Sequence, residues 1–234
     1  MVRIVSIAGN IGSGKSTLIE EIASRYGTVP RNQSGDIISR VVTLLEPIAA
    51  WTAPALEDGR SMLGAFYSDP AENALAFQTY VLVSRVKQLE DALSQIRAEG
   101  DGDSVLILME RGPWVDMALM ARPMLSSGML SAMDWYVYGM LNDMLVARLP
   151  SVDAIVYLRA GVADCTARIN TRARSDEQDR IDAAYLAALH DSHDAYFASP
   201  NAANFHCVHS SCDTSVGELA DSVVAWFADK LIYI

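Results

Sequence analysis

Residues 2–17 of the chain read VRIVSIAGNIGSGKST. The mostly apolar run over residues 2–8 predicts a buried strand, and apolar residues at helical spacing predict a helix over residues 15–26. The loop between them carries the pattern G-x-x-x-x-G-K-[ST], which begins at Gly9 and ends at Ser16. With a strand before it and a helix after it, this pattern is typical of loops that bind the phosphates of a nucleoside triphosphate. A glycine-rich turn without a ligand is the alternative interpretation.

The chemistry of such a loop follows from its residue types. Glycines allow successive backbone N–H groups to point at one phosphate, and the helix N-terminus adds partial positive charge. Lys15 can reach the outer phosphates, and the Ser16 hydroxyl can hold Mg²⁺. The chain contains neither the D-x-x-G nor the N-K-x-D element of a GTPase switch, so a small phosphotransferase is expected. The expected phosphate-binding residues are Gly9, Asn10, Gly12, Ser13, Gly14, Lys15, Ser16 and Thr17.

Composition and charge limit the class of protein. The chain has 234 residues, 51% of them apolar, and its 18 Lys and Arg against 29 Asp and Glu give a net charge of −11. This length fits one folded domain over residues 1–234. Nucleic acids and anionic membranes attract proteins of the opposite charge, so neither is an expected partner. Three cysteines are too few for a disulfide scaffold, and no leader or membrane-spanning run is visible, which predicts a cytoplasmic protein.

Short apolar runs alternate with helical patterns along the rest of the chain. Such strands form a parallel sheet with helices on both faces. The fold that we expect for the whole chain is a P-loop α/β/α fold with a five-stranded parallel sheet in the order 2-3-1-4-5 and an arginine-rich lid. Residues 52–73 are expected to be mostly irregular, and Asn73 to cap the next helix. Pro123 and Ser126-Ser127-Gly128 are expected to separate the helices 114–121 and 131–149. The expected strands cover residues 2–8, 41–46, 105–109, 154–158 and 205–208, and the expected helices residues 15–26, 73–98, 114–121, 131–149, 181–197 and 216–230.

Charged residues stand at the ends of two predicted strands. Glu46 ends the second strand, and Glu110 and Arg111 follow the third. The carboxyl ends of parallel strands meet at one edge of the sheet, where such folds bind ligands. A carboxylate there can accept a proton from an attacking hydroxyl or hold Mg²⁺, and an arginine can neutralise phosphate charge. Taken singly, each residue could instead be a solvated charge at a strand end.

Two helices carry polar groups suited to a nucleobase and to phosphates. Gln78 and Arg85 share one face of the helix 73–98, where an amide can read a base edge; a polar helix seam is the other interpretation. Arg168, Arg172 and Arg174 follow the fourth strand. They form either a lid that clamps the transferring phosphate or ion pairs with the chain's own acids.

Five ordered blocks of the sequence resemble the deoxyribonucleoside kinase family, of the deoxycytidine and deoxyguanosine kinase type. The resemblance extends from Arg3 to about Phe197. It implies Mg²⁺-dependent transfer of the γ-phosphoryl group of ATP or another triphosphate to the 5′-hydroxyl of a deoxyribonucleoside. The matching blocks are the phosphate loop 9–17, Glu46-Pro47 with Trp51, Phe77-Gln78-Thr79-Tyr80 with Ser84-Arg85, Glu110-Arg111 with Asp116, and the lid segment 172–178.

The resemblance also implies roles for individual residues. Glu46 is the expected general base on the 5′-hydroxyl, with Arg111 beside it and Lys15 on the phosphates. Glu110 is expected to help Ser16 place Mg²⁺. The other residues with implied roles are the lid arginines Arg168, Arg172 and Arg174, Tyr67 and Glu177 at the sugar 3′-hydroxyl, and Trp51, Phe77 and Gln78 at the base.

The pair Arg85 and Asp116 resembles that of family members that take deoxycytidine and purine deoxynucleosides rather than thymidine. Asp116 can accept from an exocyclic amine, which thymine lacks, and Arg85 can hold the acid in place. Two departures from the family pattern stand out. Gly112-Pro113 replaces its serine and could shift the backbone before Asp116. Residues 210–213 do not match its donor-base loop, so the choice between ATP and another triphosphate stays open.

Apolar residues on more than one face of the helices 114–121 and 131–149 favour a homodimer, as the resemblance does; burial within one chain is the other interpretation.

The rival enzyme is a nucleoside monophosphate kinase, whose charged acceptor would favour arginines at the place of Glu46. The rival outside enzymes is a nucleotide-binding regulatory protein without turnover.

Overall fold

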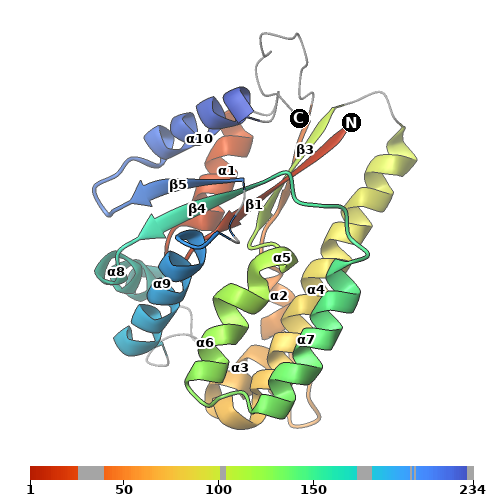
Figure 1. Cartoon of the computed structure of the whole chain (residues 1–234), viewed down its shortest axis with the longest axis vertical. Helices are drawn as coiled ribbons and strands as arrows, with labels where there is room; N and C mark the ends of the chain where they lie inside the picture. Colours follow the sequence, from red (N-terminus) through yellow and green to blue (C-terminus); the bar gives the residue numbers. More distant parts are fainter. Residues whose placement is uncertain (26–39, 101–103, 173–180, 201, 203, 231–234) are drawn as a thin grey trace.

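The strands form one parallel sheet in the order β2-β3-β1-β4-β5, which confirms the predicted order (Figure 1). In its register, Ile7 of β1 pairs with Glu110 of β3, so these two strands end at the same edge. The computed structural model describes residues 1–25, 40–100, 104–172, 181–200, 202 and 204–230. The strands are β1 (Val2–Ala8), β2 (Arg40–Leu44), β3 (Val105–Glu110), β4 (Ala154–Ala160) and β5 (Phe205–Ser210).

Ten α-helices and one π-helix accompany the sheet within the described ranges. Over those ranges, no helix combines the length and the apolar character needed to cross a membrane. The helices are α1 (Lys15–Arg25), α2 (Ile48–Thr52), α3 (Met62–Ser68), α4 (Pro70–Glu99), α5 (Pro113–Asp116), η1 (Met117–Ala121, the π-helix), α6 (Arg122–Ser126), α7 (Ala132–Val146), α8 (Val162–Arg172), α9 (Ala183–Phe197) and α10 (Val216–Lys230).

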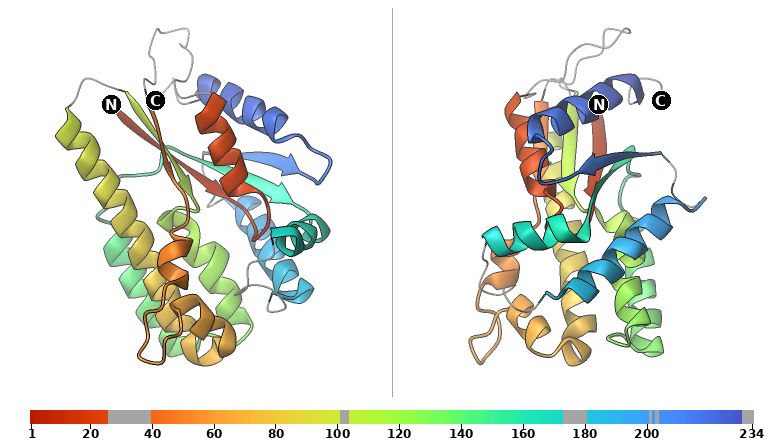
Figure 2. Two further views of the ribbon diagram at one scale, coloured as in Figure 1. Left: turned by 180° about the vertical axis from the view of Figure 1, so that it is seen from behind. Right: turned by 90° about the vertical axis from the view of Figure 1, so that its left-hand side faces the viewer.

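Helices cover both faces of the sheet, because neighbouring strand residues are apolar and point to opposite sides. Val5 of β1 packs in a core with α1 and α10, whereas its neighbour Ile4 packs in a core with Leu89 and Leu93 of α4. Around β4, Ile155 and residues of α9 and η1 form a further core on the second face. Figure 2 shows α1 and α10 on one side of the sheet and α4 on the other. The predicted three-layer α/β/α architecture is confirmed.

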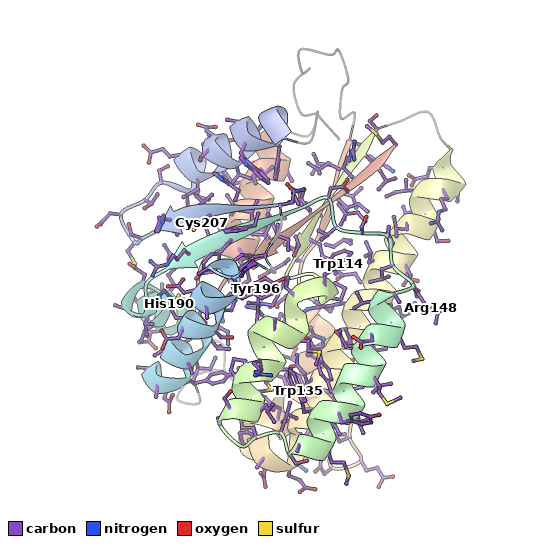
Figure 3. All side chains as sticks on the ribbon, in the orientation of Figure 1. Trp114, Trp135, Arg148, His190, Tyr196 and Cys207 are labelled. Atoms are coloured by element: carbon purple, nitrogen blue, oxygen red, sulfur yellow. The ribbon has the colours of Figure 1, made fainter. Side chains whose placement is uncertain are left out.

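A separate core, which we call the second core to distinguish it from the cores on the faces of the sheet, lies beyond the carboxyl ends of the strands, between α2, α3, α4, α6 and α7 (Figure 1). Its centre holds Phe66, Phe77 and Tyr138, all buried. At its margin, Trp135 of α7 lies beside α6, where the Arg122 guanidinium covers the indole ring at 5.4 Å (Figure 3). The cavity described below lies where this helical core meets the sheet.

The prediction of mostly irregular structure over residues 52–73 was wrong. Helix α3 forms within this segment, and the Ser61 hydroxyl caps it by accepting from the Gly64 N–H at 2.9 Å. Helix α4 is capped by Asp69 and begins at Pro70, so Asn73 lies inside the helix and is not its cap. Aspartate at the cap and proline at the first helical position favour this start. The apolar side of α3 is stabilised by the second core, a tertiary contact that local sequence does not reveal.

The predicted break at Pro123 was wrong, whereas the predicted break at residues 126–128 is confirmed, since α6 ends at Ser126 and α7 begins at Ala132. The chain continues from α5 through the π-helix η1 into α6. In η1 the Arg122 N–H donates to the Met117 carbonyl five residues earlier, instead of four. This wider turn precedes Pro123, which has no N–H to donate, and the helical path continues past it.

Candidate active site

A cavity of about 320 Å³ lies at the carboxyl ends of β1, β2 and β3. The phosphate loop forms one end of it, and α4 with the segment around Asp116 forms the other. Its volume falls in the range of roughly 300–1,000 Å³ that is typical of small-molecule sites. The predicted site residues that line it are Gly12, Lys15, Ser16, Glu46, Trp51, Tyr67, Phe77, Gln78, Arg85, Glu110, Arg111, Asp116 and Arg172.

The phosphate loop has a backbone that requires glycine at its turn. Gly12 has a φ of 76°, and a Cβ there would lie 2.6 Å from the Cys165 carbonyl oxygen. The Asn10 side chain donates to the Leu186 carbonyl at 2.9 Å and therefore ties the loop to α9 rather than facing the cavity. Thr17 is exposed and does not line the cavity. Of the eight predicted phosphate-binding residues, Gly12, Lys15 and Ser16 line it.

Lys15 is buried at the floor of this end. Its ammonium donates to the Asn10 carbonyl at 2.8 Å and lies 3.8 Å from the Glu110 carboxylate. Burial, and then the positive charge of Arg111, lower the pKa of Lys15 to about 8. The group is therefore charged at neutral pH but loses its proton more readily than an exposed lysine does.

Ser16 and Glu110 place oxygen atoms beside Lys15. The Ser16 hydroxyl donates to Glu110 Oε2 at 2.9 Å. Hydroxyl and carboxylate oxygens are ligands that Mg²⁺ prefers, and its other positions are usually filled by water and substrate phosphates. The two side chains therefore fit a Mg²⁺ ion at the phosphate end.

A left-handed backbone at Arg111 brings two consecutive charged side chains to one cavity. Side chains alternate between opposite faces along a strand, but β3 ends at Glu110 and Arg111 has a φ of 52°. This conformation is unusual for a residue with a Cβ and costs roughly 1–2 kcal/mol. Arg111 then donates to Glu46 Oε1 at 2.6 Å and to the Gly9 carbonyl at 2.9 Å.

Glu46 stands between the two ends of the cavity. Its Oε1 accepts from Arg111 and also from Arg85, each at 2.6 Å. Burial by itself would raise the pKa of Glu46, but the guanidiniums of Arg111 and Arg85 outweigh it and hold the pKa at about 2. The carboxylate is therefore ionised at neutral pH and can act as a proton acceptor.

The far end of the cavity contains a buried network around Asp116. Arg85 is 2% exposed and pairs with Asp116 Oδ1 through one guanidinium nitrogen and with Glu46 through another. Gln78 Nε2 donates to Asp116 Oδ2. This end therefore offers amide and carboxylate groups to the edge of a ligand.

Gly112 and Pro113, which replace the serine of the family pattern, leave room for the indole ring of Trp114. A Cβ at position 112 would lie 2.6 Å from the Trp114 ring, so glycine leaves room for that side chain. The Gly112 N–H donates to the Ser6 hydroxyl at 2.8 Å, and Pro113 starts α5. Asp116 at the end of α5 reaches Arg85 and Gln78.

Aromatic side chains form the walls between the two ends. Phe77 stacks on Phe66 with ring centroids 4.8 Å apart, and Trp51 meets Phe77 edge-on at 6.2 Å. The Trp51 indole N–H donates to the Ser84 hydroxyl at 3.0 Å, and the Arg85 guanidinium lies over its ring. Such rings suit a flat, partly apolar ligand.

The predicted lid arginines differ in position. Arg168 donates to the Ser13 carbonyl at 2.8 Å and to the Ser211 carbonyl at 2.6 Å, so it joins the phosphate loop to the segment after β5. Arg172 lines the cavity. Arg174 and Glu177 lie outside the described residues.

The sequence interpretation missed several residues of this site. Phe66 stands next to the predicted Tyr67, and an aromatic pair before α4 is a signal that could have drawn attention to it. Tyr138 comes from α7, and its hydroxyl donates to Asp116 Oδ2 at 2.9 Å. No local pattern marks it, because it reaches the site only through the packing of α7 on α4. The further lining residues include Leu63, Met120, Met124 and Tyr185.

Comparison with known proteins gives matches over most of the chain. A family model described as deoxynucleoside kinase matches residues 5–222. Deoxycytidine kinase 2 of Gallus gallus is 28% identical over 214 residues, covering 83% of this chain and 74% of that protein. Mitochondrial thymidine kinase 2 of Homo sapiens is 27% identical over 195 residues, covering 82% and 63%.

A solved structure shares the fold along its whole length. The structure of deoxyadenosine kinase from M. mycoides with bound dCTP superposes with a TM-score of 0.69 at 20% identity, covering 99% of this chain and 100% of that one.

Proposed function

The chain belongs to the deoxynucleoside kinase family, and we propose that it transfers the γ-phosphoryl group of ATP or another nucleoside triphosphate to the 5′-hydroxyl of a deoxyribonucleoside. The observation that carries this proposal is the position of Glu46. One carboxylate oxygen lies 2.6 Å from Arg111 on the phosphate side and 2.6 Å from Arg85 on the other side. A hydroxyl held there would stand between a proton acceptor and the phosphate loop.

In the proposed reaction, the 5′-oxygen attacks the γ-phosphorus while the bond to the bridging oxygen of the leaving diphosphate breaks. Glu46 accepts the hydroxyl proton, and Arg111 stabilises the charge on the transferring group. Lys15 binds the outer phosphates from the floor of the loop. A nucleoside hydroxyl that replaces one arginine contact of Glu46 makes the carboxylate more basic, so the proton is accepted more readily when the hydroxyl attacks.

The phosphate end is expected to work with Mg²⁺. Ser16 and Glu110 would hold the ion through their 2.9 Å pair of oxygens. Bound there, Mg²⁺ neutralises negative charge on the outer phosphates of the triphosphate. Arg168 and Arg172 complete the positive surroundings from α8.

The base end favours deoxycytidine or purine deoxynucleosides over thymidine. The Asp116 carboxylate accepts hydrogen bonds, and Arg85 holds it in place through a buried ion pair. An exocyclic amine of the base can donate to this end, whereas the thymine carbonyl at the same place would face another acceptor.

An assay of nucleoside diphosphate release, ADP from ATP and UDP from UTP, tests the proposed function. Deoxycytidine, deoxyadenosine, deoxyguanosine and thymidine are supplied as acceptors, each with ATP and with UTP as the donor. Nucleoside monophosphates are supplied in parallel. Turnover that depends on a deoxynucleoside supports the proposal. Turnover with monophosphates alone would identify a monophosphate kinase, and no turnover with any acceptor would favour a regulatory protein.

The proposal includes a homodimer formed through α7. Apolar side chains at helical spacing lie along its outer face: Met133 is 77% exposed, Tyr136 68% and Met140 60%. A contiguous apolar stripe of this kind is typical of an interface, and a second copy would cover it with its own stripe. The double substitution Tyr136→Glu with Met140→Glu should halve the mass measured by sedimentation equilibrium. Asp213→Lys, at an exposed site elsewhere, should leave the mass unchanged.

The proposed location is the cytoplasm. The three cysteines Cys165, Cys207 and Cys212 are all unpaired, as is usual in a reducing compartment.

A further inference from the structure

Tyr138 lies behind the base end of the cavity rather than in its wall. The side chain comes from α7, is fully buried, and does not line the cavity. Its hydroxyl lies 2.9 Å from Asp116 Oδ2 and 3.4 Å from Gln78 Nε2, and both of these residues do line the cavity. Tyr138 can therefore affect a ligand only through Asp116 and Gln78.

The direction of each hydrogen bond in this group follows from its chemistry. An ionised carboxylate accepts hydrogen bonds and donates none. Burial, reinforced by the charge of Asp116, raises the pKa of Tyr138, so its hydroxyl keeps its proton and donates to the carboxylate. The part of the Gln78 amide that faces Asp116 must then be its NH₂ group. The amide oxygen of Gln78 is left to serve a ligand.

The carboxylate is held by three donors. Arg85 donates to Oδ1, while Gln78 and Tyr138 both donate to Oδ2. Two donors on one oxygen, from helices α4 and α7, fix the plane of the carboxylate and the rotation of the amide together. If the Tyr138 hydroxyl is removed, the carboxylate can turn, and the Gln78 amide can reverse and present its NH₂ group to the ligand.

We propose that Tyr138 is a positioning residue for base selection: through Asp116 it orients Gln78 so that the amide oxygen, an acceptor, faces the base. This inference rests on the proposed function. The ligand group that fits is an exocyclic amine, and a carbonyl at the same position of the base is disfavoured. Selectivity thus depends on a residue that touches no part of the substrate.

The test uses two pairs of nucleosides, and the members of each pair differ in the group of the base that would face Gln78. Deoxycytidine and deoxyuridine differ in an amine against a carbonyl at one ring position, and the adjacent ring nitrogen is an acceptor in the first and an N–H donor in the second; deoxyadenosine and deoxyinosine differ in the same way. The wild-type protein should prefer the amine member of each pair in kcat/KM. In Tyr138→Phe this preference should fall about tenfold or more, the factor expected when one hydrogen bond to a charged group is lost. Tyr138→Met, whose flexible side chain fills irregular space, serves as a second variant without the hydroxyl.

A matched control is provided by another buried tyrosine. Tyr157 donates to Asp194 at 2.7 Å, is also buried, and does not line the cavity. Tyr157→Phe removes the same kind of hydrogen bond, so it should cost comparable stability while leaving both substrate preferences unchanged.

Two outcomes would overturn the proposal: an unchanged preference in both Tyr138 variants, which includes an equal loss of kcat/KM for both members of each pair, or an equal shift of preference in Tyr157→Phe. A wild-type protein that phosphorylates none of these four nucleosides, and neither deoxyguanosine nor thymidine, would refute the proposed function instead. In that case the shift in melting temperature caused by each nucleoside decides the inference. Stronger stabilisation by the amine members, lost in Tyr138→Phe, would support it, and equal stabilisation by both members would refute it.

Discussion

Replacement of Glu46 by glutamine is the most direct test of the proposed chemistry. The variant keeps the shape of the side chain, and its amide oxygen can still accept from Arg85 or Arg111, which lie 2.6 Å from Oε1. The variant loses the negative charge and therefore the ability to take a proton at neutral pH. Arg85 keeps its ion pair with Asp116, and Arg111 keeps its bond to the Gly9 carbonyl, so the cavity should retain its form.

The magnitude follows from the low pKa of this carboxylate. General base catalysis contributes typically about 10²–10⁴-fold to a rate. With a pKa of about 2, Glu46 is a weak base while both arginines hold it, which places the expected loss of kcat at the lower end, about 10²-fold to 10³-fold. That loss corresponds to roughly 3–4 kcal/mol of transition-state stabilisation.

The assay measures kcat for ADP release with a saturating deoxynucleoside and, separately, the affinity for the triphosphate by calorimetry. We expect the affinity for the triphosphate to stay within a few fold of the wild type, because Glu46 faces the acceptor. Glu90→Gln, an exposed position on α4, is the control and should behave as the wild type does. A kcat for Glu46→Gln within about threefold of the wild type would refute the role of Glu46 as the base.

Further predictions concern pH, base choice and the phosphate loop. Because the pKa of Lys15 is about 8, kcat/KM for the triphosphate should fall as the pH rises through 8 and should be restored on return to pH 7; a flat profile up to pH 10 would contradict this. Replacing Arg85 by Met together with Asp116 by Ala should raise kcat/KM for thymidine relative to deoxycytidine, about tenfold or more, measured with both acceptors in parallel. Arg168→Gln should weaken triphosphate binding about tenfold in calorimetry, since the bond from Arg168 to the Ser13 carbonyl holds the loop, while nucleoside binding stays unchanged.

The sheet and the meeting of charged groups at its edge could be predicted because they depend on local patterns and one topological rule. The strand, loop and helix at residues 2–17 carry the hydrophobic period and the glycine spacing in the sequence itself. Glu46, Glu110 and Arg111 converge because the carboxyl ends of parallel strands share an edge of the sheet. The cavity between them is consistent with that rule.

Other features depend on contacts between distant parts of the chain. Helix α3 is stabilised by the second core, and Tyr138 reaches Asp116 across 22 residues from a different helix. The left-handed backbone of Arg111 is also hidden from a pattern-based interpretation, since arginine has no preference for it. Each of these requires knowledge of the packing before it can be seen.

Glu46 Oε1 joins two arginines that serve different ends of the cavity, and this has a consequence for anyone who wishes to redesign the substrate range. Removing Arg85 to admit a new base takes away one of the positive charges that keep the carboxylate acidic, so the strength of the base beside the hydroxyl changes as well. Recognition and turnover are therefore not separable modules in this protein. A substitution that changes base recognition is therefore expected to change the rate of phosphoryl transfer as well, and the two have to be optimised together.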